Sequence, residues 1–304
     1  MSNQPVVVLA GGTGGAKLAR GILDVVGPDE LVVIANTGDD IEIYGAYVSP
    51  DPDLATFWLA DEIDERGWGL RGDTFHVMDG LRGLGVEVWF NLGDRDLAIG
   101  IERSRALEQG STLTQAHGTI TAAFGVRAQV LPMTDAPVRT RVLAGGRWWP
   151  FQEFMIRMRG AGPVSGVDLR GAKIAAPTSA VRAAIANARA IVIGPSNPIA
   201  SIGPVLALEG LRGALADSPA AVVAVSPLVH GQVLKGPTAA FMQWAGQPLS
   251  SDGIAALYRG VIDGLVCDQR TALVPALEID VLLDTAAARR RVAEQTLRFA
   301  DALG

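Results

Sequence analysis

The sequence predicts an α/β protein with a Rossmann-like, doubly wound and mostly parallel sheet and an inserted α+β segment in its middle. Short β-branched runs alternate with longer helical patterns, and 36 glycines and 17 prolines separate them at short intervals. The first strand candidates are apolar at every position, as strands covered on both faces require. The 304 residues fit one large domain or two coupled ones. We expect a single domain over residues 1–304, because no long flexible linker interrupts it.

The first βαβ unit is the clearest part of this pattern. Val6–Ala10 and Leu31–Ala35 are apolar runs, and Ala16–Val26 between them has helical spacing. Further strands are expected at Val86–Phe90, Ala128–Leu131, Val138–Leu143, Ala190–Ile193, Ala221–Val225 and Gly264–Val266. Further helices are expected at Leu54–Leu59, Thr74–Leu84, Ala98–Gln109, Ser179–Asn187, Thr238–Trp244 and Thr285–Leu303.

The middle of the chain is less regular. Residues 111–167 combine a weak helical pattern, two or three strands and the aromatic run Trp148-Trp149-Pro150-Phe151. This stretch predicts either an inserted subdomain or a dimer-forming arm. Its aromatic side chains, with Phe154, either stack on a flat ring of a ligand or pack in a core or a dimer contact.

Composition excludes several classes of protein. Hydrophobic residues make up 49% and charged residues 19%, so the chain is too apolar to be disordered. A net charge of −6 argues against a broad electrostatic grip on nucleic acid. The N-terminal residues lack the basic and apolar pattern of a secretory signal, and glycines and prolines break the longest uncharged stretch. We therefore expect a cytoplasmic protein with no membrane or nucleic-acid partner.

Cysteine and histidine chemistry is not indicated. The single cysteine, Cys267, excludes an intramolecular disulfide and a multi-cysteine metal site. His76, His117 and His230 lie far apart without the spacing of a zinc site. We expect these histidines to be surface or hydrogen-bonded residues.

A glycine-rich turn, Gly11-Gly-Thr-Gly-Gly-Ala-Lys17, joins the first strand to the first helix. Glycines let the backbone approach a ligand closely, and a helix N-terminus offers free N–H groups to a phosphate. The pattern is neither that of a dinucleotide fold nor a Walker loop, and a merely tight turn is the alternative. Lys17 is expected in solvent. The expected ligand contacts are Gly11, Gly12, Thr13, Gly14 and Gly15.

Acidic residues follow the second strand, where doubly wound sheets bind ligands. Asn36-Thr-Gly-Asp39-Asp40 ends that strand, and Pro50-Asp51-Pro-Asp53 follows on a proline-stiffened loop. If the loop folds back, carboxylates suited to Mg²⁺ converge, with Asp39, Asp51 and Asp53 as ligands and Asn36 as a substrate contact. The alternative is that Asp53 caps a helix while Asp40 and Asp51 face solvent.

Two further segments are candidate phosphate contacts. Leu92-Gly-Asp94-Arg95-Asp96 follows the strand expected at 86–90, so Arg95 either faces a phosphate, held by Asp94 and Asp96, or forms a structural salt bridge. The loop after Ala190–Ile193 offers uncharged donors from Ser196, Asn197 and Ser201, or else is a simple turn.

Taken in order, these segments resemble the CofD family of 2-phospho-L-lactate transferases, whose actinobacterial members are called FbiA. The resemblance rests on eight motifs that cover nearly the whole chain. They are VLAGGTGGAKLARG, NTGDD, SPDPD, RGWGLRGDTF, LGDRDLA, PFQEFMIR, GPSNPIASIGPVL and SPLVHGQVLKGP.

The resemblance implies a Mg²⁺-dependent transfer in coenzyme F420 biosynthesis. A phospho-carboxylate group, carried as its guanosine diphosphate conjugate, passes to the ribityl hydroxyl of the deazaflavin FO, and GMP is released. It also implies a homodimer, contact of Asp39 with FO and the metal, and acidic partners at Asp51 and Asp53. Residues 11–15 and the Ser196-Asn197 loop would hold the guanosine diphosphate part, and Arg95 would face a phosphate. No general base is assigned: either Asp39 or Asp40 accepts the hydroxyl proton, or the metal makes a base unnecessary.

Two departures from the family pattern leave the transferred group open. Ile99-Gly100 stand where the family usually has Thr-His, and residues 151–155 are less aromatic than usual. Lactyl, enolpyruvyl and glyceryl donors are all compatible with the motifs. A nucleotide-sugar-binding regulator of the related gluconeogenesis-factor type is the alternative, and an NAD-dependent oxidoreductase ranks last because the turn lacks the dinucleotide fingerprint.

Overall fold

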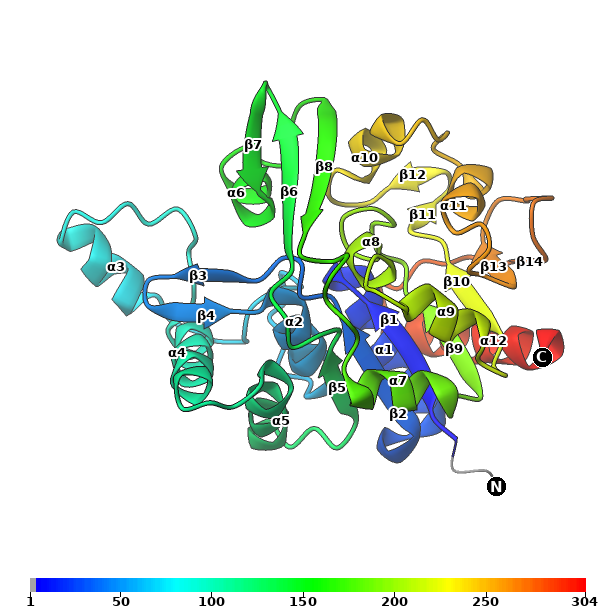
Figure 1. Cartoon of the computed structure of the whole chain (residues 1–304), viewed down its shortest axis with the longest axis horizontal. Coiled ribbons are helices and arrows are strands. Elements are labelled where there is room, and N and C mark those ends of the chain that lie inside the picture. Colours follow the sequence, from blue (N-terminus) through cyan, green and yellow to red (C-terminus); the bar gives the residue numbers. More distant parts are fainter. Residues whose placement is uncertain (1–3) are drawn as a thin grey trace.

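A seven-stranded parallel sheet forms the centre of the computed structural model, which describes residues 4–304 (Figure 1). Every strand pair in it is parallel, which confirms the predicted sheet. Across the sheet the strands are β14 (Ala276–Glu278), β13 (Gly264–Cys267), β10 (Val222–Val225), β9 (Ala190–Ile193), β1 (Val6–Ala10), β2 (Leu31–Ala35) and β5 (Gln129–Pro132).

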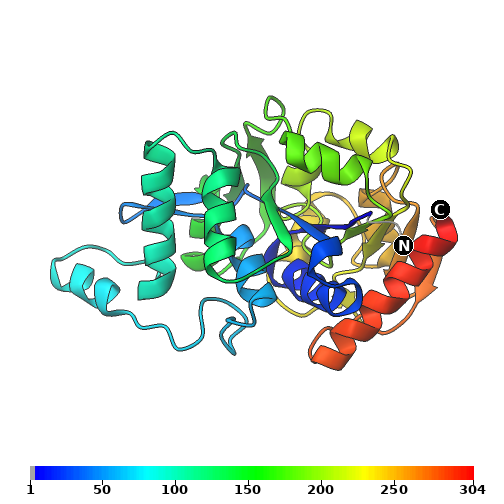
Figure 2. The ribbon, with the colours of Figure 1, turned by 90° about the horizontal axis from the view of Figure 1, so that it is seen from below.

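Helices cover both faces of this sheet, because successive side chains of a strand point to opposite sides. Val6 and Val8 face one core, and Val7 and Leu9 face the other. Figure 2 shows two of the helices of the first face, α1 and α12, side by side. The first face holds α1 (Gly12–Val26), α2 (Pro50–Leu59) and α12 (Ala286–Leu303). The second holds α7 (Ser179–Ala186), α8 (Gly203–Leu206), α9 (Leu211–Ala216) and α11 (Ser251–Leu257).

The order of the strands reverses between β1 and β9. From β1 the sheet grows through β2 to β5, and from β9 it grows the other way through β10 and β13. Val6 accordingly pairs with Leu31 on one side and with Ala190 on the other. A crevice opens at the carboxyl ends of the strands at such a reversal, which is where ligands bind in this class of fold.

A second, antiparallel sheet stands apart from the first. It contains β7 (Arg147–Pro150), β6 (Arg139–Ala144) and β8 (Val164–Arg170), and helix α6 (Phe151–Ile156) lies against it (Figure 1). Phe154 is fully buried there, edge-on to Phe241 with ring centroids 6.1 Å apart. Part of the middle segment therefore forms a separate layer, whereas α5 (Leu113–Ala123) and β5 from the same segment pack with the central sheet.

A second extension lies between β2 and β5. It contains the hairpin β3 (Ile41–Ile43) and β4 (Ala46–Val48), with α3 (His76–Gly83) and α4 (Asp94–Glu108). The strand expected at Val86–Phe90 is wrong, because this segment pairs with no strand. The backbone N–H groups of Trp89 and Phe90 donate instead to the hydroxyl of Tyr44, at 3.1 and 3.2 Å.

The other predicted elements are present, four of them with the predicted bounds (β1, β2, β9 and α10) and the rest with shifted ends. Helix α1 begins at Gly12 rather than at residue 16, and α4 begins at Asp94 rather than at residue 98. No helix within residues 4–304 is long and apolar enough to cross a membrane. The remaining short elements are η1 (Pro28–Glu30), β11 (Leu228–Val229), β12 (Gln232–Val233) and α10 (Thr238–Trp244).

Candidate active site

A large cavity opens at the strand-order reversal. Its volume is about 1100 Å³, and it is lined by the turns that follow β1, β9 and β10. This exceeds what one drug-sized ligand needs, which is roughly 300–1000 Å³. The cavity is therefore large enough for a ligand of substantial size. From these turns the lining residues are Gly11, Gly12, Thr13, Gly14, Pro195, Ser196, Asn197, Ser201, Ser226 and Pro227.

The glycine-rich turn is packed directly against the loop after β9. Gly12 has a φ of +66°, which favours glycine. A side chain at Gly14 would place its Cβ 1.9 Å from the carbonyl oxygen of Pro195. Gly15 does not line the cavity, because it lies between Ala10 and Ser196. The glycines therefore serve close packing of the cavity floor as well as access to a ligand.

Asp51 is held in place beside this turn. One of its carboxylate oxygens accepts from the backbone N–H of Gly12 at 2.7 Å, and the other accepts from Asn36 Nδ2 at 2.9 Å. The amide oxygen of Asn36 accepts from the N–H of Gly38 at 2.8 Å. The alternative that Asp51 faces solvent is wrong, since it is buried. Asn36 thus orients the acid and does not itself line the cavity.

Asp39 and Asp51 form a buried acidic pair at the cavity wall. Burial and the charge of Asp51 raise the pKa of Asp39 well above its usual range, and burial raises the pKa of Asp51 to about 6. Within the described residues, Asp39 Oδ1 is buried without a hydrogen-bond partner. A cation would satisfy this oxygen and offset both charges, so the pair fits a divalent metal. Among residues 4–304 no group of three or more acidic, histidine or cysteine side chains is arranged as a metal site, so the predicted ligand set of Asp39, Asp51 and Asp53 does not come together.

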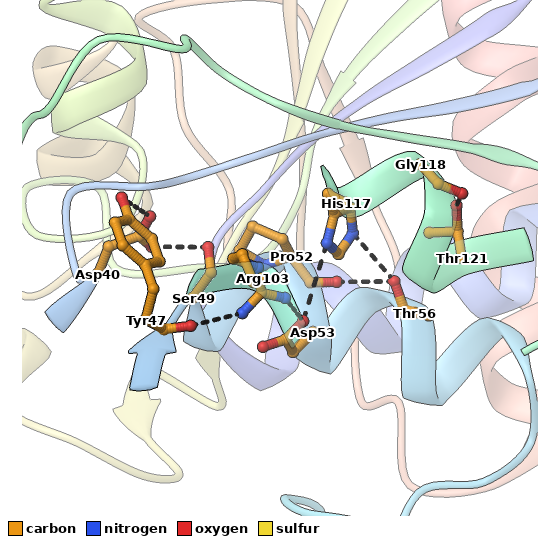
Figure 3. A network of polar contacts seen from close by, with 10 residues as sticks. All are labelled: Asp40, Tyr47, Ser49, Pro52, Asp53, Thr56, Arg103, His117, Gly118 and Thr121. Carbon is orange, nitrogen blue, oxygen red and sulfur yellow. Dashed lines mark hydrogen bonds and ion pairs between the residues drawn. The ribbon is translucent and has the colours of Figure 1, made fainter. Parts of the chain in front are cut away.

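Asp53 lines the same cavity but is already paired. Its carboxylate accepts from the guanidinium of Arg103, which is fully buried, and His117 lies on its other side, with Nδ1 at 3.8 Å (Figure 3). Burial and the charge of Arg103 lower the pKa of His117 to about 3, so this histidine is neutral. Asp53 is not the helix cap, because Ser49 occupies that position.

Asp40 does not line the cavity. Its carboxylate accepts from Ser49 Oγ at 2.8 Å and from the hydroxyl of Tyr47 at 3.0 Å (Figure 3). Burial raises its pKa to about 7. The solvent-facing alternative is wrong for Asp40 as well. The residue connects β4 to the start of α2, and that start carries Asp51.

Asp94, Arg95 and Asp96 separate in the structure. Asp94 accepts from the backbone N–H groups of His76 and Val77, both at 3.0 Å, and so begins α3. Arg95 lies outside the cavity lining and approaches Glu62 at 3.4 Å. Their expected place at the edge of the main sheet is wrong, because no strand precedes them. Asp96 does line the cavity, and burial with the charges of Asp53 and Asp73 raises its pKa to about 7.

The loop after β9 contributes three of the predicted contacts. Ser196 and Ser201 are buried and line the cavity, and within the described residues Ser196 Oγ has no hydrogen-bond partner. The Asn197 amide oxygen accepts from the N–H groups of Ile199 and Ala200, at 2.9 and 3.0 Å. The Asn197 side chain therefore stabilises the turn, which was the alternative interpretation of this loop. The residue nevertheless lines the cavity.

Several cavity residues were not expected from the sequence. Lys17 lines the cavity instead of facing solvent, and Lys235 joins it from the turn after β12. The segment between α2 and α3 contributes Arg66 and Trp68, with the guanidinium carbon 4.4 Å from the ring centroid. Of the four aromatic residues considered from the sequence as a stacking surface, Phe151 from α6 lines the cavity, and Trp148, Trp149 and Phe154 do not. The scarcity of lysine was a sequence signal that could have drawn attention to Lys17 and Lys235, because the chain has only three lysines.

The profile of the family described as "2-phospho-L-lactate transferase CofD" matches residues 6–295. The chain belongs to this family. It is 38% identical to the 2-phospho-L-lactate transferase of Methanosarcina mazei over 266 residues, which is 87% of each chain. It is 39% identical to the phosphoenolpyruvate transferase of Kitasatospora aureofaciens over 271 residues, 86% of this chain and 84% of that one.

Solved structures show a similar fold at low sequence identity. Protein BH3568 from Bacillus halodurans superposes with a TM-score of 0.63, covering 97% of this chain and 99% of its own, at 18% identity. A second structure of BH3568, described as a member of the UPF0052 family, gives a TM-score of 0.61 at 16% identity. These likenesses confirm the architecture, and the CofD membership rests on the sequence matches.

Proposed function

We propose that this CofD family protein transfers a phospho-carboxylate group from its guanosine diphosphate conjugate to the ribityl hydroxyl of FO, releasing GMP, in coenzyme F420 biosynthesis. FO is 7,8-didemethyl-8-hydroxy-5-deazariboflavin. The observation that carries the proposal is the buried Asp39–Asp51 pair, which lies beside the glycine-rich turn in a cavity of about 1100 Å³. The names of the relatives support the class of reaction.

The two sides of the cavity supply complementary groups. The turn at residues 11–14 and Ser196 offer backbone N–H and hydroxyl donors without charge, which suits a diphosphate. Asp39 and Asp51 would hold Mg²⁺, which when bound neutralises charge on the diphosphate during the transfer. Trp68, Trp89 and Phe151 offer flat apolar surfaces for the deazaflavin ring.

The chemistry needs alignment more than covalent assistance. The ribityl oxygen attacks the phosphorus that carries the carboxylate-bearing group, a new P–O bond forms, and the P–O bond to GMP breaks as GMP leaves. The hydroxyl proton must also depart. Asp40 is occupied by Ser49 and Tyr47, which leaves Asp39 as the carboxylate that could accept it; an Asp39 oxygen that holds Mg²⁺ cannot also take the proton, and the metal then makes a general base unnecessary.

The transferred group stays open among lactyl, enolpyruvyl and glyceryl forms, since relatives bear both 2-phospho-L-lactate and phosphoenolpyruvate transferase names. We further propose a cytoplasmic homodimer. The middle segment offers one interface, because Trp148 is 38% exposed on β7. Sedimentation of the purified chain as a strict monomer would argue against the dimer.

The first test is a fluorescence titration of the purified protein with FO, with and without Mg²⁺ and GDP. Saturable binding in the micromolar range, about −8 kcal/mol, supports the transferase. Absence of FO binding, together with a thermal shift caused by a UDP-sugar, would instead support the nucleotide-sugar-binding regulator. Turnover of the guanosine diphosphate conjugates of lactyl, enolpyruvyl and glyceryl phosphate would then identify the donor.

A further inference from the structure

The cavity has a cationic part that the proposed reaction does not yet use. Lys17 reaches it from α1 and Lys235 from the turn after β12. The charges of Lys235 and Arg289 lower the pKa of Lys17, and the charge of Asp284 raises it. Lys17 and Lys235 thus act on one another within the same cavity.

Asp284 is the acidic residue whose charge acts on Lys17, and it lines the same cavity, but no ion pair joins the two within residues 4–304. Within residues 4–304, neither lysine forms a hydrogen bond or an ion pair, and Arg289 Nε is buried without a partner. Lys17 Nζ and the Arg289 guanidinium carbon lie 5.8 and 5.1 Å from the centroid of the Trp58 ring. Burial lowers the pKa of Lys17, and the positive charges of Lys235 and Arg289 lower it further. An anion bound between these groups would offset the cost of burying the charged form of Lys17 and reduce the repulsion between the positive charges.

The use of lysine is itself selective. The chain has three lysines among 26 basic residues, and two of the three line this cavity. An ammonium group is a compact charge on a flexible stem with three donors, which suits a terminal phosphate or carboxylate oxygen. The third lysine, Lys173, lies exposed in the turn after β8, away from the cavity, and is an internal reference.

We propose that Lys17 and Lys235 form an anion-binding subsite of the cavity, which takes phosphate or carboxylate oxygens of the guanosine diphosphate-linked donor. This inference rests on the proposed function. Lys17 lies on α1, which begins at the glycine-rich turn, and both the turn and Lys17 line the cavity. The oxygens come either from the diphosphate itself or from the carboxylate of the transferred group.

Amine labelling tests the subsite without turnover. The protein is treated with trace acetic anhydride, with Mg²⁺ and with GDP, GMP or phosphoenolpyruvate, and acetylation of each lysine is measured by mass spectrometry. At about ten times the Kd, the protecting anion should reduce labelling of Lys17 and Lys235 about tenfold and leave Lys173 unchanged. Protection by GDP and not by phosphoenolpyruvate assigns the diphosphate, and the reverse assigns the carboxylate-bearing group. No protection by any of the three overturns the subsite.

Kinetics of matched variants give a second readout. Lys17→Met and Lys235→Met keep the apolar stem, and each should raise KM for the donor about tenfold, while KM for FO and kcat stay within about twofold. Lys173→Met should change none of these values. Unchanged donor KM in both cavity variants would overturn the subsite while leaving the transferase intact. Protection by GDP in a protein that fails to bind FO would retain the subsite and reject the transferase.

Discussion

The guanidinium of Arg103 donates to the carboxylate of Asp53 across 50 positions of the sequence. Arg103 also donates to the backbone carbonyl of Tyr47 at 2.9 Å, and its side chain is fully buried. One residue of α4 thereby fastens both the hairpin β3–β4 and the first turn of α2 (Figure 3). Because Asp51 lies in that same turn, the position of the acidic pair depends on Arg103, a residue that does not itself line the cavity.

Arg103→Met is expected to destabilise the protein by about 3–5 kcal/mol, because it leaves the Asp53 charge buried without its partner. The free energy of unfolding from urea titration measures this change. Arg105→Met is the matched control, since Arg105 on the same helix forms an exposed pair with Glu102. Loss of that pair should cost no more than about 1 kcal/mol. Equal effects of the two substitutions would contradict a structural role for the buried pair.

Asp39→Asn should separate activity from stability. We expect kcat/KM to fall about 100-fold or more, roughly 3 kcal/mol, because the carboxylate beside the reacting phosphate is lost. The free energy of unfolding should rise, because a buried charge with a raised pKa is removed. Asp29→Asn is the control, as Asp29 is exposed and pairs with Arg127. An Asp39→Asn enzyme of full activity would remove Asp39 from the proposed site.

The position of Asp39 at the sheet edge could be predicted from the sequence. Continuous apolar runs identified β1, β2 and β9, because strands covered on both faces need such runs, and the acids after β2 had to lie at the sheet edge. Arg103 and His117 carried no such signal. Each lies in the middle of a helix with no neighbouring motif, and only the tertiary contact with Asp53 gives it a role.

Asp96→Asn should change how stability depends on pH. Burial and the charges of Asp53 and Asp73 raise the pKa of Asp96 to about 7 in the folded protein. Between about pH 4 and pH 7 the folded state keeps a proton that the unfolded state has released, so this group contributes less stability as pH rises. The asparagine variant lacks this loss. Relative to wild type, it should therefore gain on the order of 1 kcal/mol or more between pH 5 and pH 8, measured by urea unfolding without divalent ions.

Asp94→Asn should show the opposite dependence of stability on pH in the same experiment. Hydrogen bonds from Thr74 and from the N–H of Val77 lower the pKa of Asp94. Its contribution to stability is thus present above the usual carboxyl pKa and is lost as pH falls through the lowered value. Asp94→Asn should be less stable than wild type at pH 8, and the difference should shrink in acid. The same pH trend in both variants would refute the assignment of these two environments.

Gly14→Ala tests the close packing of the cavity floor. The added methyl would meet the carbonyl oxygen of Pro195 at 1.9 Å, so the loop after β9 must shift. We expect destabilisation of about 2 kcal/mol or more, measured by thermal unfolding. Gly118→Ala is the control, because Gly118 lies within α5 and a methyl there would meet nothing within 4 Å. That change should stabilise the protein by about 0.5–1 kcal/mol.

Arg95→Ala should leave kcat/KM within roughly threefold of wild type, a change under about 1 kcal/mol. Arg95 contacts Glu62 and the carbonyl oxygen of Arg71, its side chain is 51% exposed, and it does not line the cavity. Steady-state kinetics with saturating FO measure the effect. A loss of 100-fold or more would restore Arg95 as a phosphate contact.

The error at Arg95 has a physical origin. The expected strand at Val86–Phe90 would have brought residues 94–96 to the sheet edge, and alternating apolar residues fit a strand equally well. In the structure these residues cover the hairpin β3–β4 and the hydroxyl of Tyr44 instead. Periodicity reports burial on one side, and it does not distinguish a paired strand from an extended segment that packs on another element.

β1 lies in the middle of the central sheet, yet its neighbour β9 is encoded far along the chain, with Val6 opposite Ala190 and Leu9 opposite Ile193. During synthesis, β1 leaves the ribosome long before that neighbour, and only β2 and β5 are available to pair beforehand. An unpaired apolar strand edge recruits other chains. The nascent protein therefore passes through a long interval of aggregation risk, and fragments that end before β9 should depend on chaperones to remain dispersed.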